Sequence, residues 1–164
     1  MNIQPCGDLL PALSLINAAA EAYRGVIPPD CWHEPYMSLD ELRHEVATGV
    51  AFWSLEIDGA PRGVMGIQPM RDIDLIRHAY VSPEFQRRGI GAALLQHLRE
   101  ASTRRMLVGT WAAADWAIDF YRRNGFVQVP SDATARLLRT YWTIPERQIQ
   151  TSVVLANPPL DNVG

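Results

Sequence analysis

One stretch, residues 79–95, constrains the fold more than any other; it reads Ala-Tyr-Val-Ser-Pro-Glu-Phe-Gln-Arg-Arg-Gly-Ile-Gly-Ala-Ala-Leu-Leu. It predicts a buried strand, a short loop, and then an amphipathic helix with Ile90 and Leu94 on its apolar face. Glycines at 89 and 91 let the backbone turn sharply and approach a ligand without a Cβ atom in the way. The fold must therefore bring a strand end, a glycine loop and a helix start to one point.

The start of that helix suits a phosphate group. The first N–H groups of a helix have no acceptor inside the helix, and the helix dipole adds positive charge at the same end. Other phosphate loops fit poorly, because the chain has no Gly-x-x-x-x-Gly-Lys-Ser/Thr and no Gly-x-Gly-x-x-Gly opening an N-terminal strand–helix unit. The glycine pattern by itself also fits an ordinary strand-to-helix turn.

Length and composition set further bounds. With 164 residues, of which 48% are hydrophobic and 20% charged, the chain is expected to form a single domain over 1–164. A net charge of −3 gives no reason to expect nucleic acid as a partner, and no apolar run approaches a membrane span. Cys6, Cys31 and the four histidines form no metal-ligand spacing, so no metal is expected. A cytoplasmic location is the default expectation.

Two helices are expected before the first long strand. Asp8 can cap a helix that stops before Gly25, and Ser38-Leu-Asp-Glu41 is a capping-box pattern for the second helix. An ordered loop rich in proline and aromatic residues joins them. Three strands then follow, with a tight turn at Asp58-Gly59 between the first two; their predicted ranges are 50–57, 62–68 and 73–81.

The C-terminal half alternates helices and strands. After a helix at about 91–101, the pattern predicts a strand, a helix that ends at Asn124-Gly125, and a short strand. A further helix through Leu137 and Leu138 is expected before the last strand. Three antiparallel strands followed by β–α–β alternation indicate a mixed α/β sheet covered by helices. The strands of this half are predicted over 106–111, 126–129 and 149–155, and the helix between the first two over 115–123.

Two motifs resemble those of the GNAT family, the general N-acetyltransferases. The loop Gln86-Arg-Arg-Gly-Ile-Gly91 is similar to the family's Gln/Arg-x-x-Gly-x-Gly/Ala cofactor motif, and Ala117-Ile-Asp-Phe-Tyr-Arg-Arg-Asn-Gly-Phe126 resembles its Phe-Tyr-x-x-x-Gly-Phe motif. The resemblance implies an α/β (α+β) fold with a mixed, mostly antiparallel sheet of six to seven strands. About four helices flank that sheet, and its central strands splay apart.

The same resemblance implies acetyl-CoA as the acetyl donor. In this family the loop amides hold the pyrophosphate, and the pantetheine arm pairs with free backbone groups of the first splayed strand. A strand with an ordinary sheet partner is the alternative for 79–81. The cofactor-binding residues implied by the resemblance are Ala79, Tyr80, Val81, Gln86, Arg87, Arg88, Gly89, Ile90, Gly91 and Ala92.

Tyr121 is the candidate catalytic residue. In many family members the matching tyrosine lies near the cofactor sulfur and protonates the departing thiolate. A thiolate of pKa about 8.5 is a fair leaving group, and a phenol of pKa about 10 can donate a proton to it. Packing between Phe120 and Phe126 is the alternative role of Tyr121. An asparagine that the family often carries seven residues earlier is replaced here by Ala114, so one cofactor contact is missing.

The general base is not evident from the sequence. Family members often place Glu or His at the positions of Leu75 and Arg77, and neither residue is a base at neutral pH. His78 is adjacent, but the two-residue period of a strand predicts that it points to the opposite face from Arg77. Ordered water remains open as a route for the proton, as do three carboxylates: Glu34, Glu56 and Asp119.

Arg77 has two interpretations of equal weight. It clamps a carboxylate or phosphate of the acceptor, which would then be a small amine with an acidic group, or it pairs with an internal acid such as Asp74 or Glu56. Aromatic side chains are candidates for the wall of the acceptor site, and each also fits core packing: Trp53, Trp32, Tyr36 and Trp142.

The sequence therefore favours an acyltransferase that moves the acetyl group of acetyl-CoA directly to the amine of a small molecule or peptide. Because no base is evident, the alternative is a module of the same fold that binds CoA or acyl-CoA as a sensor without turnover. The apolar segment Val153-Val154-Leu155 either mediates a homodimer or completes the sheet of the monomer.

Overall fold

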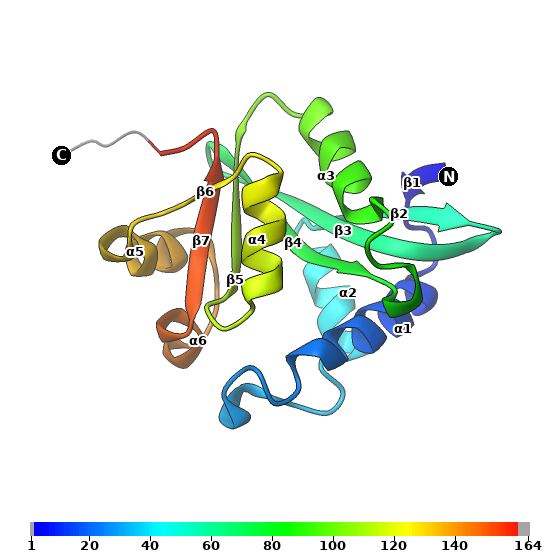
Figure 1. Ribbon diagram of the computed structural model, residues 1–164, viewed down its shortest axis with the longest axis horizontal. Coiled ribbons are helices and arrows are strands. Elements are labelled where there is room, and N and C mark those ends of the chain that lie inside the picture. Colours follow the sequence, from blue (N-terminus) through cyan, green and yellow to red (C-terminus); the bar gives the residue numbers. More distant parts are fainter. Residues whose placement is uncertain (1, 161–164) are drawn as a thin grey trace.

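The computed structural model describes residues 2–160, and these form a seven-stranded sheet with helices packed on both of its faces (Figure 1). In spatial order the sheet is β1-β2-β3-β4-β5-β7-β6, and every neighbouring pair is antiparallel except β4 and β5, which are parallel. The strands are β1 (Asn2–Pro5), β2 (Ala51–Ile57), β3 (Ala60–Met70), β4 (Ile73–Val81), β5 (Arg105–Trp111), β6 (Val127–Gln128) and β7 (Ser152–Asn157).

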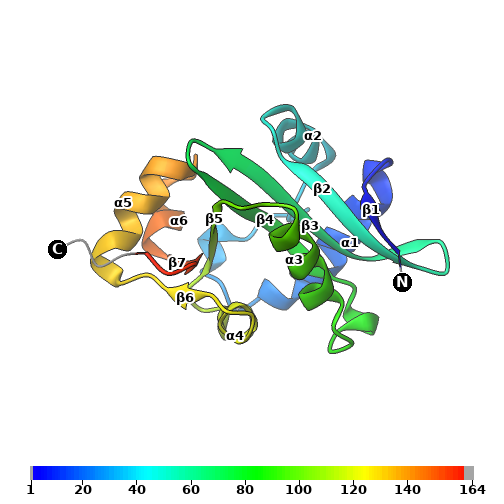
Figure 2. The same cartoon turned by 90° about the horizontal axis from the view of Figure 1, so that it is seen from above.

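The helices form two layers. Helices α3 and α4 cover one face, where Leu55, Met65 and Ile76 of the sheet meet Leu94 and Leu98 of α3. Helices α1 and α2 cover the other face beside β2 and β3, and α5 and α6 continue that layer beside β5 and β7 (Figure 2). The helices are α1 (Leu9–Ala20), α2 (Leu39–Ala47), α3 (Ile90–Glu100), α4 (Asp115–Arg123), α5 (Ser131–Tyr141) and α6 (Glu146–Gln150).

The fold class predicted from the sequence is confirmed: the sheet is mixed, mostly antiparallel and seven-stranded. The described residues contain six α-helices where about four were expected, and strand β1 was not predicted. The capping predictions for the first two helices hold, since Asp8 accepts from the N–H of Leu10 and Ser38 accepts from the N–H of Glu41. At the turn between β2 and β3, Asp58 and Gly59 both have positive φ, as a tight hairpin requires.

The predicted last strand, 149–155, is wrong at its start. Ile149 lies in α6, where the helical turn after Pro145 buries it against Leu137 and Leu138, and the strand begins only at Ser152. Strand β7 pairs with β5 along one edge and with β6 along the other. The segment 153–155 therefore completes the sheet of the monomer.

The two central strands separate halfway along their length. The parallel pairing of β4 with β5 joins only Ile73–Ile76 to Arg105–Val108, and from Arg77 onward β3 is the only described strand that pairs with β4. At this point β4 contains a β-bulge: Arg77 faces Gly66 and Tyr80 faces Val64, so two residues of β4 stand opposite Met65 alone. A bulge bends the strand that carries it, which moves the end of β4 away from β5.

The bulge also changes which side chains share a face. His78 adopts a left-handed backbone conformation with φ of 56°, and its side chain approaches Glu45 of α2, as does that of Arg77. Ala79 and Val81 point instead into the core under α3 and α4. The prediction that His78 and Arg77 lie on opposite faces is therefore wrong, because the bulge interrupts the two-residue period.

No helix among residues 2–160 has the length and apolar character needed to cross a membrane.

We expect Gly63→Ala to destabilise the packing of β3 against α3. A Cβ atom at Gly63 would lie 2.5 Å from Cγ2 of Ile90 and 3.0 Å from Cδ1 of Leu94, both in the core. Such overpacking costs about 1–3 kcal/mol of unfolding free energy, which urea denaturation measures. Gly7→Ala is the control, because a Cβ there meets nothing within 4 Å and φ is not positive. Equal stability of the two variants would contradict the close approach of β3 and α3.

Candidate functional site

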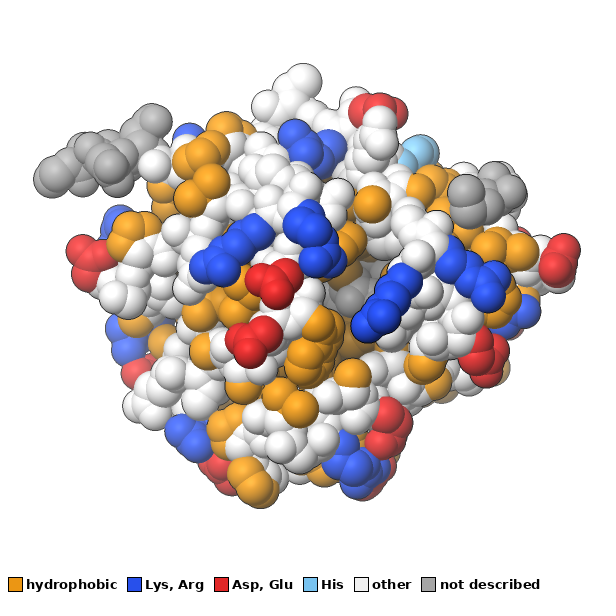
Figure 3. All heavy atoms as spheres, viewed as in Figure 1, with side chains coloured by type: hydrophobic (Ala, Val, Ile, Leu, Met, Phe, Trp, Pro, Cys, Tyr) orange, Lys and Arg blue, Asp and Glu red, His pale blue; other side chains and the backbone are white. Residues whose placement is uncertain are grey.

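Two depressions meet where β4 and β5 separate. The first, the loop cleft, has a volume of about 920 Å³ and lies between α4 and the loop before α3. The second, the aromatic cavity, has a volume of about 130 Å³ and lies between the splayed strands and α5–α6. Figure 3 shows a hollow in this face of the molecule with arginine side chains on both sides. The residues that line both depressions are Tyr23, Ala79, Tyr80, Ala117 and Tyr121.

The loop cleft contains a run of free backbone donors. None of the N–H groups of residues 87–92 has a hydrogen-bond acceptor among residues 2–160, and α3 has no side-chain cap. Arg87 and Gly89 have positive φ, 64° and 79°, so the backbone turns twice before the helix begins. Free amides at a helix start, combined with the helix dipole, make an anion-binding site.

The two glycines of the loop have different roles. Gly89 needs its left-handed conformation, while a Cβ atom built on it would meet nothing within 4 Å. Gly91 has no such φ, but its Cβ would lie 3.2 Å from the ring of Phe120 on α4. Gly91 therefore lets α3 and α4 pack closely, and Gly89 shapes the loop.

The predicted cofactor residues are brought together, with one exception. Ala79, Tyr80, Val81 and most of the loop line the loop cleft, whereas Arg88 turns aside and its guanidinium lies 4.8 Å from the ring centre of Phe85. Arg123 and Asn124 of the α4 end also line this cleft and were not predicted. The loop-cleft residues from the prediction are Ala79, Tyr80, Val81, Gln86, Arg87, Gly89, Ile90, Gly91 and Ala92.

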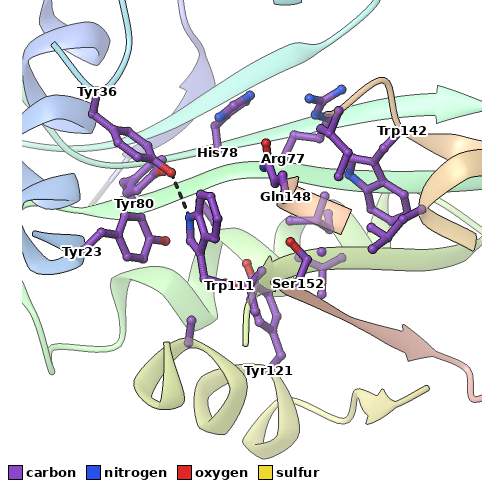
Figure 4. A pocket seen from close by; sticks show the side chains of 18 residues that line it. Tyr23, Tyr36, Arg77, His78, Tyr80, Trp111, Tyr121, Trp142, Gln148 and Ser152 are labelled. Carbon is purple, nitrogen blue, oxygen red and sulfur yellow. Dashed lines mark hydrogen bonds between the residues drawn. The ribbon is translucent and has the colours of Figure 1, made fainter. Parts of the chain in front are cut away.

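Tyr121 lies at the junction of the two depressions. Its side chain is 5% exposed, and its ring meets those of Phe120 and Phe126 at centroid distances of 5.0 and 5.5 Å. Figure 4 shows its hydroxyl directed into the aromatic cavity. Burial raises the pKa of Tyr121, so the hydroxyl stays protonated at neutral pH. The packing role from the sequence is therefore confirmed, and the catalytic role of Tyr121 stays a prediction.

Aromatic rings form the walls of the second cavity. Trp111 Nε1 donates a hydrogen bond of 3.1 Å to the Tyr36 hydroxyl, and Tyr23 lies 5.5 Å from Tyr36 and 6.3 Å from Tyr80 between ring centres. Of the predicted wall residues, Tyr36 and Trp142 line the cavity. The ring of Trp32 packs against that of Tyr36, with 5.7 Å between the ring centres, and Trp32 does not line the cavity itself.

Trp53 lies apart from both depressions. It contacts His97 of α3 with a centroid distance of 4.7 Å and packs against the core under that helix. Tyr23, the Tyr80 side chain and Trp111 were not predicted for the cavity. A signal for two of them exists, since Tyr80 is the penultimate residue of β4 and Trp111 is the last residue of β5, the two strands that separate.

Arg77 pairs with an acid that the sequence did not indicate. Its guanidinium donates to Oε1 of Gln68 at 3.1 Å and to Oε1 of Glu45 at 3.3 Å. Asp74 contacts Ser102 and Arg104 instead, so the internal-acid interpretation holds with a different partner from the ones named. Burial lowers the pKa of Arg77, although Glu45 opposes the shift.

Glu45 also approaches His78. The Nε2 atom of His78 lies 3.5 Å from Oε1 of Glu45 without a hydrogen bond, and Oε2 of Glu45 is buried with no partner among the described residues. Burial alone would raise the pKa of Glu45, but His78, Arg77 and His44 together hold it below its usual value. Glu45 is therefore a carboxylate that balances the charge of Arg77.

The three carboxylates left open as bases are separated by the fold. Asp119 lines the loop cleft, Glu34 pairs with Arg24 at the surface, and Glu56 lies on β2 opposite Asn2. His78 lines the aromatic cavity. Among residues 2–160 no three His, Cys, Asp or Glu side chains gather as metal ligands would.

A splayed mixed sheet with a glycine loop and free amides at a helix start is the arrangement that the resemblance to the GNAT family implies. Residues 48–128 match the family model described as acetyltransferase (GNAT) domain. Over these residues the chain is similar to GNAT acetyltransferases. No curated protein sequence matches it significantly.

Solved structures with the same fold include enzymes with CoA bound. The PaiA N-acetyltransferase of Thermoplasma acidophilum in complex with coenzyme A aligns with a TM-score of 0.70 and 16% identity, over 95% of this chain and 98% of that one. A GNAT acetyltransferase of Elizabethkingia anophelis with acetyl-CoA bound gives 0.64 and 18%, over 94% and 95%. The ribosomal-protein-S18-alanine N-acetyltransferase of Escherichia coli gives 0.60 and 18%, over 94% and 91%. At these identities the likeness shows the shared fold.

We expect the buried tyrosines to make the fold sensitive to high pH. Burial raises the pKa values of Tyr23, Tyr36, Tyr80 and Tyr121, whereas the unfolded chain ionises them near pH 10. The folded state then binds more protons than the unfolded state, so the contribution of these tyrosines to the unfolding free energy is fully present below about pH 10 and is lost above it. Urea denaturation at pH 9 and 11, with tyrosinate absorbance, measures both effects. Ionisation of all tyrosines near pH 10 in the folded protein would contradict the burial.

Proposed function

We propose that this protein is an N-acetyltransferase that moves the acetyl group of acetyl-CoA directly to the amine of a small acceptor. One observation carries the proposal: the loop cleft and the aromatic cavity meet at Tyr121, beside the segment of β4 that has lost its pairing with β5. A donor in one depression and an acceptor in the other come together at that point. Holding two reactants in line supplies much of the rate of such a transfer.

In this proposal the donor occupies the loop cleft. The free amides of 87–92 take the pyrophosphate, and Arg87 and Arg123 add positive charge at the rim. The pantetheine arm, which is peptide-like, pairs with the backbone of residues 79–81 on the edge that β5 leaves open. The thioester then lies at the junction of the two depressions. Arg88 packs on the ring of Phe85 and does not contact the donor in this proposal.

Proton transfers involve groups on both sides of the junction. Tyr121, kept protonated by burial, donates to the CoA thiolate as it departs. Of the candidate bases, His78 is the one that lines the aromatic cavity, and its imidazole lies on the Glu45 face of β4, so we assign to it the removal of the ammonium proton through water. The tetrahedral intermediate forms and collapses without a covalent acetyl-enzyme.

The alternative, a sensor that binds CoA without turnover, explains less of the geometry. A sensor needs the loop cleft but has no use for a second cavity that opens onto the thioester position beside a buried phenol. Acceptor-dependent release of CoA from acetyl-CoA distinguishes the two functions: release that rises with an added amine supports the enzyme. Binding of acetyl-CoA with no release for any amine supports the sensor.

We expect Gly89→Val to weaken acetyl-CoA binding at least about tenfold while the fold persists. A branched side chain is strained at φ of 79° and forces the loop to rearrange, although no neighbour blocks it. Calorimetry measures the affinity. Gly59→Val is a matched control, because its φ is 77°, its Cβ also meets no atom within 4 Å, and it lies in the β2–β3 turn. Normal affinity in Gly89→Val would refute the loop assignment.

We expect Tyr121→Phe to lower kcat by about 10- to 100-fold, because the thiolate loses its proton donor while the ring packing is kept. The affinity for acetyl-CoA changes little. Tyr141→Phe is the control, since that hydroxyl bonds Asp72 and the residue lines neither depression. Unchanged turnover of Tyr121→Phe across the pH range would leave Tyr121 with a packing role alone.

A further inference from the structure

Among residues 2–160, no acidic side chain lines the aromatic cavity. The 18 residues that line it include four tyrosines, Tyr121 among them, and two tryptophans, but neither Asp nor Glu. An acceptor that carries a second ammonium group would bring that charge into a partly buried site without a carboxylate to pair with. An unpaired charge in such a site is strongly unfavourable. The lining therefore disfavours diamines and polyamines.

The one arginine of the lining is already neutralised. Both terminal nitrogens of Arg77 have acceptors, Gln68 and Glu45, and its side chain is 17% exposed. In Figure 4 the Arg77 side chain lies across β4 from Tyr121. A carboxylate on the acceptor would have to compete with the charge of Glu45 at close range. The geometry therefore disfavours an acidic acceptor as well.

What the cavity does offer is flat aromatic surface on two sides, with the polar side chains of Gln148 and Ser152 also in its lining. The Trp142 ring lies against the backbone of Gly109, where a Cβ would sit only 3.3 Å from its Cζ2 atom. Figure 4 shows Trp142 across the cavity from Tyr23, Tyr36 and Trp111. The hydrogen bond from Trp111 to Tyr36 holds that opposite wall in place. Two aromatic walls suit a flat ring, because aromatic rings stack or meet edge to face.

The size of the cavity fits one ring. Its volume is about 130 Å³. An apolar protein cavity of about 150 Å³ takes up a benzene molecule. The hydroxyl of Tyr121 and the thioester position adjoin this space, so a short chain from the ring would bring an amine to the acetyl group.

We infer that the acceptor is a small monoamine carried on an aromatic ring, of the arylalkylamine class, with the ring between Trp142 and the Tyr36–Trp111 wall. This inference rests on the proposed acetyltransferase function and adds the acceptor class to it. It replaces the acidic amine that the sequence suggested through Arg77.

Four amines with related structures test the acceptor class in a CoA-release assay. They are 2-phenylethylamine, 2-cyclohexylethylamine (the same size without a π system), phenylalanine (the same ring plus a carboxylate) and spermidine. We expect kcat/KM for 2-phenylethylamine to exceed that for phenylalanine and spermidine at least about tenfold, because each of these carries a charge that the cavity leaves unpaired. We expect kcat/KM for 2-phenylethylamine to exceed that for 2-cyclohexylethylamine by about 3- to 10-fold, because only the phenyl ring can stack on the aromatic walls.

Two variants at Trp142 test whether the preference for the aromatic amine depends on this ring. Trp142→Ala raises KM for 2-phenylethylamine at least about tenfold and removes the preference over 2-cyclohexylethylamine, while KM for acetyl-CoA is unchanged. Trp142→Phe keeps a ring and restores most of the preference. Melting temperatures of both variants establish that they are folded, and the within-variant ratio of the two amines is independent of the amount of active protein.

The contradicting outcomes separate the two levels of inference. Preference for spermidine or phenylalanine, or equal use of the phenyl and cyclohexyl amines, overturns the aromatic acceptor and leaves the acetyltransferase standing. Acetylation of a peptide N-terminus but of none of these amines also overturns the aromatic acceptor and leaves the acetyltransferase standing. If no amine or peptide causes release of CoA although acetyl-CoA binds, the proposed function itself is overturned.

Discussion

The β-bulge at His78 is the feature on which the rest of the site depends. Upstream of it, β4 and β5 pair as ordinary parallel strands, and downstream of it they do not. The separation leaves one edge of residues 77–81 without a strand partner and opens the two depressions that meet at Tyr121. The same irregularity moves His78 to the face of Arg77, where both approach Glu45. A left-handed histidine costs conformational energy, and a strained residue of this kind is found where a site needs it.

Much of the fold was predictable because the local signals agree with the tertiary structure. The glycine loop, the caps at Asp8 and Ser38, and the Asp58-Gly59 turn each specify a backbone conformation that the structure adopts. The loop residues that line the cleft follow from the same local chemistry, since backbone amides at a helix start do not depend on side-chain identity. The error at Ile149 arose because a helical turn of five residues and the start of a strand share the same apolar pattern, which periodicity alone does not separate.

The other side of the site was less predictable, because it is assembled by contacts across the sheet. A strand period of two residues cannot reveal a bulge, so the face of His78 was wrongly predicted. Glu45 is 32 residues from Arg77 in the sequence, and nothing in the sequence near either residue indicates that they pair. The aromatic walls draw on the segment after α1, on both splayed strands and on the end of α5, and Trp53, an aromatic residue of the same kind, faces α3 instead. The resemblance to the family suggested aromatic wall residues, but the fold decided which rings form the cavity.

The central claim is that the splayed edge of β4 and the amides before α3 together hold the acetyl donor. Hydrogen exchange of the backbone amides, measured with and without saturating acetyl-CoA, tests it most directly, because it reports on the N–H groups themselves. The predicted result is slower exchange at residues 79–81 and 87–92, with little change in α6. Unchanged exchange in both segments, while acetyl-CoA is bound, would contradict the claim.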